Sequence, residues 1–241
     1  FRIDSGTKIV GAAKAKDYIL ILTDTSAYLM QFVGPPFTFS IRQVGSNCGC
    51  VGQHSIVYAN GAVYWISDSG GFFMFDGTVK ALPSLVEDFV FQTNDNAPGF
   101  NFANGSEITY AAHNSLFSEI SWFYASSTSS YIDRQVTFNY AEQTWTTSSL
   151  ARTTFTGAHL FDQPIATEFD VSFTPTTPTI QGVSNGASRV FNHEIGTNQV
   201  LADGTTTAVP AFITSGDFDL DAQGDGEYFI KLRRFIPDFK Y

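Results

Sequence analysis

The sequence predicts an all-β protein built from antiparallel sheets, with little helix. Among its 241 residues are 24 Phe and 10 Tyr, whereas only 15% of the residues are charged. Aromatic residues are enriched in strands, and short apolar runs bounded by turn residues recur along the chain. Helical signal is confined to Ser84–Phe91, where Ser84 and Glu87 have the spacing of a capping box. We therefore expect one short helix in a β protein.

The predicted strands fall into three groups along the chain. Asn60-Gly61 lies between two hydrophobic runs, which is the strongest short-range signal of a hairpin. The segment Ser67–Phe73 resembles a partial Asp-box turn, and we interpret it as a structural turn. The first group thus predicts a hairpin, and the second predicts an antiparallel meander of three consecutive strands. The predicted strands are 18–23, 26–32, 55–58, 62–66, 72–75, 119–125 and 135–140.

The second and third groups share a pattern at the end of a strand. Phe75 is followed by Asp76-Gly77, and Tyr140 is followed by a short turn and Trp145, which is expected to start an outer strand. This pattern is similar to that of a kelch-type blade, and propellers repeat four-stranded blades of about 40–50 residues. The sequence therefore predicts a β-propeller-like domain with degenerate repeats. Because this length gives only about five blades, we expect either a small propeller or one completed by other parts of a longer chain.

Changes in composition predict three regions of the chain. Residues 1–173 are expected to contain the main blades. Residues 174–210 are rich in Thr, Pro and Gly, which predicts a loop-rich insertion with a return strand, and Thr205–Pro210 is a second predicted loop. Residues 211–241 are expected to supply C-terminal strands that complete the β domain.

Composition also excludes several classes of protein. Thirteen Lys and Arg against 23 Asp and Glu give a net charge of -10, which excludes a broadly basic nucleic-acid-binding surface. There is no run of the ~20 apolar residues that a membrane span needs. Cys48 and Cys50 are too few for a disulfide framework or a four-ligand zinc site, and we interpret them as small buried side chains.

Two clusters near the C-terminus are candidate sites with two interpretations each. Asp217, Asp219 and Asp221 alternate as calcium ligands do, but the intervening apolar residues favour a strand with its acidic face in water. The basic residues of the last segment form either the polar face of a strand or a subunit interface that closes a ring. They are Lys231, Arg233, Arg234 and Lys240.

The sequence contains no recognisable catalytic or cofactor-binding motif. Its four histidines are scattered, and His193 is expected to be buried and hydrogen-bonded rather than catalytic. No nucleophile elbow, metalloprotease helix or phosphate loop is present. We therefore expect no enzymatic activity, no cofactor and no resident metal.

An ordered series of short segments resembles the propeller of tail nozzle (tail tubular) and packaged-DNA stabilisation proteins of short-tailed bacteriophages. The resemblance implies a structural virion protein of the tail, assembled in the host cytoplasm as a homo-hexameric ring below the portal. Such a head-to-tail connector contacts portal, adaptor and other tail proteins, retains the packaged genome, continues the DNA channel and permits DNA ejection. The segments are 21–29, 34–39, 45–52, 60–66, 122–126, 133–140, 150–153, 164–166, 191–196, 215–219 and 236–239.

Two alternative functions remain open at this point. A β-propeller can bind a carbohydrate or a peptide at its central opening, or it can act as a glycoside hydrolase. The hydrolase needs a pair of carboxylates in a defined relation, and the sequence does not identify such a pair. An acidic channel is compatible with the structural role, because it would let DNA slide without many strong phosphate contacts.

Overall fold

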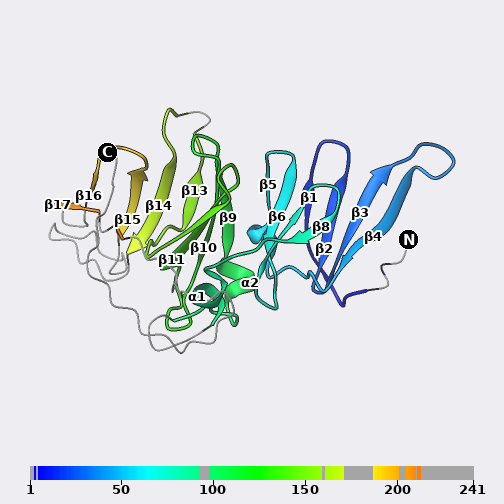
Figure 1. Cartoon of the computed structure of the whole chain (residues 1–241), viewed down its shortest axis with the longest axis horizontal. Helices are drawn as coiled ribbons and strands as arrows, with labels where there is room; N and C mark the ends of the chain where they lie inside the picture. Colours follow the sequence, from blue (N-terminus) through cyan, green and yellow to red (C-terminus); the bar gives the residue numbers. More distant parts are fainter. Residues whose placement is uncertain are drawn as a thin grey trace, which may run out of the picture. The chain divides into compact units, whose positions relative to one another are not determined.

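The computed structural model describes residues 3, 5–92, 98–158, 161–170, 187–200, 205–209 and 211–212. The chain divides into two units, residues 1–196 and residues 197–241, and each is described by itself. Most of the described regular structure is antiparallel strand (Figure 1). The all-β prediction is therefore confirmed.

The first sheet is a four-stranded meander in which each strand pairs with the next. Its middle strands agree with the predicted ones, because both contain continuous apolar runs. Its two outer strands were not predicted, since their exposed and half-buried residues give no clear alternation. The strands are β1 (Ile9–Lys14), β2 (Ile19–Thr23), β3 (Ser26–Phe32) and β4 (Phe39–Ser46).

The second sheet repeats this topology. The predicted hairpin turn is present: Asn60 and Gly61 have φ angles of 47° and 82°, as a two-residue type I′ turn requires. The strands are β5 (Val57–Ala59), β6 (Ala62–Ile66), β7 (Phe72–Phe75) and β8 (Val79–Ala81). Every residue of β6 is buried, so this strand is covered on both faces.

The third and fourth sheets continue the series. The third contains β9 (Tyr110–Asn114), β10 (Glu119–Tyr124), β11 (Arg134–Asn139) and β12 (Thr144–Ser148). The fourth contains β13 (Thr154–Thr156), β14 (Ile165–Asp170) and β15 (Ala187–Asn192). Trp145 lies in the outer strand β12, as its position after the turn predicted.

The described part of the second unit contains one hairpin, formed by β16 (Asn198–Val200) and β17 (Thr206–Ala208). This corrects the prediction that Thr205–Pro210 is a loop. The error arose because Thr is common in both loops and strands, and β-branched side chains fit a pleated strand well. The pairing partner, not the local composition, decides the structure of this segment.

Helices are short throughout the described residues. They are η1 (Gln53–Ser55), α1 (Glu87–Phe91) and α2 (Gly105–Ile108). The predicted helix is present, but it begins at Glu87 and does not form the predicted capping box. The hydroxyl of Ser84 instead accepts a bond from the backbone N–H of Val86 at 3.2 Å, so Ser84 shapes the preceding turn. No helix in the described ranges has the length and apolar character needed to cross a bilayer.

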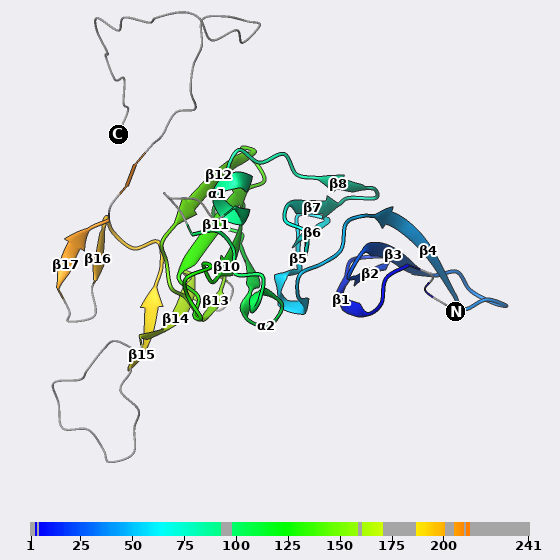
Figure 2. The ribbon, with the colours of Figure 1, turned by 90° about the horizontal axis from the view of Figure 1, so that it is seen from below.

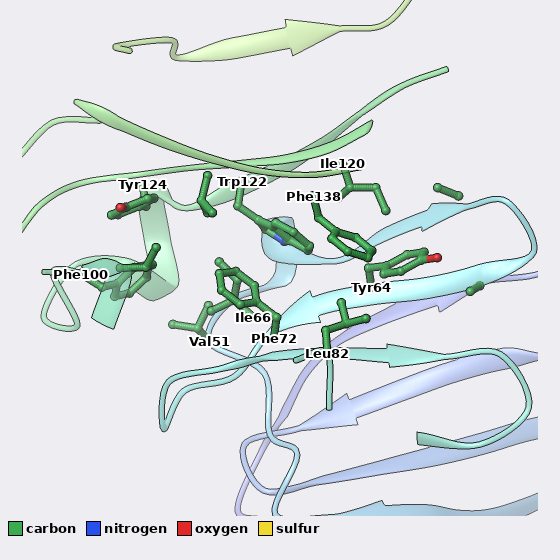
Figure 3. Packing of buried hydrophobic residues seen from close by; sticks show 14 residues of the cluster. Val51, Tyr64, Ile66, Phe72, Leu82, Phe100, Ile120, Trp122, Tyr124 and Phe138 are labelled. Atoms are coloured by element: carbon green, nitrogen blue, oxygen red, sulfur yellow. The ribbon is translucent and has the colours of Figure 1, made fainter. Parts of the chain in front are cut away.

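Neighbouring sheets of the first unit pack through alternate side chains of β6. Val63 and Trp65 join a core with the first sheet, whereas Tyr64 and Ile66 join a core with the third sheet. The second of these cores, between β6 and β10, is shown in Figure 3. The period-two pattern of one strand thus holds three sheets together.

The first strands of successive sheets lie next to one another. β1 contacts β5, β5 contacts β9, and β9 contacts β13. Figure 2 shows the first, second and third sheets one after another. The sheets therefore share one side that is formed by their first strands. Within the described residues they form no closed ring.

Candidate functional site

A cavity of about 150 Å³ lies where the third and fourth sheets meet. Its walls come from four segments: the end of α2 (Ile108), the loop after β10 (Ser130, Tyr131 and Ile132), the loop after β12 (Ala151 and Thr153) and β14 (Glu168). Its lining is largely apolar, with the Glu168 carboxylate as its charged group.

Arg152 anchors the wall of this cavity. Its side chain is nearly buried, with 9% of the residue exposed, and its Nη1 forms an ion pair with the carboxylate of Glu168. The same nitrogen donates to the carbonyl of Ala151 at 2.8 Å. The guanidinium carbon lies 4.1 Å from the centre of the Phe191 ring, a cation–π geometry. Burial lowers the pKa of Arg152, and the Glu168 charge opposes that effect.

His193 is the third member of this cluster. Its Nε2 accepts a hydrogen bond from Nε of Arg152 at 3.0 Å, because a guanidinium can only donate. Burial lowers the pKa of His193, and the positive charge of Arg152 lowers it further, to about 4. The imidazole is therefore neutral near pH 7, which makes it a structural acceptor and a poor general base. His193 is half-buried and hydrogen-bonded, so the geometry agrees with the predicted hydrogen bond and in part with the predicted burial.

Side-chain contacts tie the cluster to both sheets. The hydroxyl of Tyr110, in β9, donates to the carbonyl of Arg152 at 3.0 Å. Phe155, in β13, stands edge-on to His193 with ring centres 5.5 Å apart and also contacts Phe123 of β10. The cluster therefore joins the third sheet to the fourth.

The two thiols are buried and separate from this cluster. Burial raises the pKa of Cys48, and it raises the pKa of Cys50 to about 11. Both cysteines are free and belong to the core between the first and second sheets. Between them, a Cβ on Gly49 would lie 2.0 Å from the carbonyl oxygen of Asp24. Close packing therefore accounts for the Cys-Gly-Cys sequence. This agrees with the prediction that the two cysteines are small buried side chains.

The segment that resembles an Asp-box is a turn between β6 and β7. The N–H of Ser67 donates to the carbonyl of Gly71 at 2.9 Å, and its hydroxyl lies 3.0 Å from that of Ser69. Gly70 and Gly71 have φ angles of 86° and 111°, which glycine adopts without strain. The segment has a structural role in this turn.

The predicted C-terminal site residues lie outside the described residues. These are the acidic residues Asp217, Asp219 and Asp221, and the basic residues Lys231, Arg233, Arg234 and Lys240. Among the residues that are described, no group of three His, Cys, Asp or Glu side chains could hold a metal ion. Sequence reasoning missed the Arg152–Glu168–His193 cluster, because its members lie 16 and 41 residues apart and no local motif links them.

Comparisons with known proteins add little to this geometry. No protein-family model matches the chain, and no curated protein matches it in sequence. Among solved structures, a 2S albumin seed protein from Dolichos aligns with 78% of this chain and 95% of its own, at 11% sequence identity and a TM-score of 0.29.

Proposed function

We propose that this chain is the β-propeller part of a ring-forming structural protein of a phage tail, of the nozzle or head-to-tail connector kind. In this role the homo-hexameric ring contacts portal and adaptor proteins, continues the DNA channel, retains the packaged genome and permits its ejection. The order and packing of the sheets carry the proposal. The residue segments that resemble the phage family provide its functional part.

The sheets have the arrangement expected of propeller blades. Each of the first three is a four-stranded meander in chain order, and the first strands of neighbouring sheets lie side by side. In a propeller, the first strand of each blade lines the central axis and successive blades pack face to face. The burial of β6 on both faces fits a blade between two others. We therefore propose that β1, β5, β9 and β13 face a common axis.

Electrostatics favour passage of DNA over binding of DNA. The chain has a net charge of -10, and tight DNA binding depends on Lys and Arg that neutralise phosphates. An acidic ring would make few such contacts, so DNA could slide through it. No base-specific recognition is expected from such a surface.

The described residues give weaker support to the alternatives. Pockets that hold small molecules have volumes of about 300–1,000 Å³, whereas the cavity beside Glu168 measures about 150 Å³. Glu168 is paired with Arg152, and His193 is neutral near pH 7. This arrangement does not provide the two free carboxylates of a glycoside hydrolase.

Negative-stain electron microscopy of the purified chain tests the proposal. We expect rings of about six copies with a central opening. Monomers at every protein and salt concentration would contradict it. Hydrolysis of a glycan panel, lost on replacement of one Asp or Glu, would favour the hydrolase instead.

A further inference from the structure

The hairpin tip between β3 and β4 exposes an unusual amount of apolar surface. Its four large apolar residues are exposed to 65%, 53%, 74% and 44%, in the order Phe32, Val33, Phe37 and Phe39. The rings of Phe32 and Phe39 contact each other edge to face, with centres 5.9 Å apart. We call these four residues the apolar tip.

The apolar tip is large enough to contribute substantially to a protein interface. Because one aromatic side chain can bury about 150–250 Å², the tip offers roughly 400 Å² of apolar surface. A standard interface buries about 800 Å² on each partner, so the tip could supply about half of one side. The same sheet face continues below the tip with the partly buried Met30 and Ile41, which pair across β3 and β4.

The absence of charged residues around the apolar tip points to a second copy as its partner. Residues 31–41 contain no Asp, Glu, Lys or Arg, although the whole chain has a net charge of -10. Two strongly acidic copies repel each other over most of their surfaces. An uncharged apolar segment is therefore a suitable place for contact between them.

The cavity between the third and fourth sheets has the size of one aromatic ring. An apolar cavity of about 150 Å³ takes up a single benzene molecule, and this cavity has the same volume. Its one charged wall residue, Glu168, is already neutralised by Arg152. An entering ring would therefore meet Ile108, Ile132 and Ala151 without leaving a carboxylate unpaired.

We infer that the apolar tip of one copy docks at this cavity of the next copy, with the ring of Phe37 inside it. Phe37 is the most exposed aromatic residue described in the first unit. The tip belongs to the first sheet and the cavity to the third and fourth, at opposite ends of that unit (Figure 1). Such a contact is heterologous, and repeated heterologous contacts close into a ring when the rotation allows it. The inference rests on the proposed ring and names its subunit contact.

Three variants of the 241-residue chain test the contact. Phe37→Asp replaces the ring that enters the cavity by a carboxylate, and Ala151→Phe fills the cavity. Phe117→Asp is the matched control, because Phe117 is also an exposed phenylalanine in a hairpin turn, at 48% exposure. Tryptophan fluorescence and thermal melting establish that each variant is folded, and native mass spectrometry counts the copies. We expect Phe37→Asp and Ala151→Phe to weaken association at least about tenfold, as loss of an interface hot spot does, and Phe117→Asp to assemble like the wild type.

Mixing the two defective variants identifies the direction of the contact. The Ala151→Phe chain retains an intact tip and the Phe37→Asp chain an intact cavity, so the mixture should form heterodimers but no rings. Rings formed by Phe37→Asp alone would overturn the inference and leave the proposed function standing. Rings formed by Ala151→Phe alone would also overturn it, because the tip would then dock elsewhere. A monomeric wild type would contradict the proposed ring itself, before any variant is considered.

Discussion

The second and third sheets meet through aromatic rings, whereas the third and fourth sheets meet through a buried ion pair and a cavity. In the first contact, Phe72 of the second sheet packs against Trp122 and Trp145 of the third sheet, with ring centres 5.1 and 4.5 Å away. In the second contact, Arg152 bonds to Glu168 and to His193 beside the cavity. Buried aromatic area stabilises without regard to pH, but a buried ion pair must offset the loss of hydration of both charges. We therefore expect the first contact to contribute more to the free energy of unfolding. The second contact should depend more strongly on pH.

Replacing Trp122 should produce the largest loss of stability. The residue is fully buried, and its indole N–H donates to the carbonyl of Ser55 at 3.0 Å. Trp122→Ala would leave a cavity and an unpaired carbonyl, at a cost of about 3–5 kcal/mol. Urea denaturation followed by circular dichroism measures this loss. The exposed Phe117→Ala is the control, and a loss below about 1 kcal/mol for Trp122→Ala would contradict the account of this contact.

Replacing Arg152 should have the next largest effect. Arg152→Met removes the partner of Glu168, whose side chain is 22% exposed, so we expect a loss of about 1–3 kcal/mol rather than the full cost of an isolated buried charge. Adding Glu168→Gln to this variant should restore part of the stability, because no unpaired carboxylate then remains. Urea denaturation of the two single variants and the double variant measures the coupling. Strict additivity of the two losses would show that the ion pair contributes nothing.

Acidification should weaken the second contact through His193. In the unfolded chain His193 takes up a proton near pH 6.5, whereas in the folded protein it does so only near pH 4. The unfolded state therefore binds more protons between these values, and stability falls as pH decreases from about 6.5 to about 4. The expected loss is roughly 1–3 kcal/mol.

The variant His193→Gln isolates this contribution. Other groups also titrate in this range: burial, together with Glu194 and Glu142, raises the pKa of Glu119, which acts in the opposite direction. The difference in unfolding free energy between the wild type and His193→Gln should therefore change with pH in that window. A difference that is constant from pH 7 to pH 4 would contradict the neutral, half-buried state of His193.

The smallest expected effect is the reactivity of the two buried thiols while the chain is folded. Because burial raises the pKa of Cys48 and of Cys50, neither should react with a thiol reagent at pH 8 while the chain is folded. Both should react after denaturation in guanidinium. Rapid labelling of the folded chain would show that the core between the first and second sheets opens.

The sequence predicts the well-buried strands better than the edges and the contacts between sheets. The strand 62–66 was predictable because its residues are continuously apolar and Asn60-Gly61 fixes its turn. β1, β4 and β8 were not predicted, since strands with exposed residues lack that signal. Within the predicted loop 205–210, Thr206–Ala208 becomes a strand only through its pairing with β16. The Arg152 cluster and the apolar cavity depend on contacts between distant residues, which a single sequence does not reveal.

The number of copies in the native assembly tests the central claim most directly. Native mass spectrometry of the wild-type chain, over a range of protein concentrations, should give one dominant closed species with about six copies. A monomer that persists at every concentration would contradict the proposed ring and the subunit contact that depends on it.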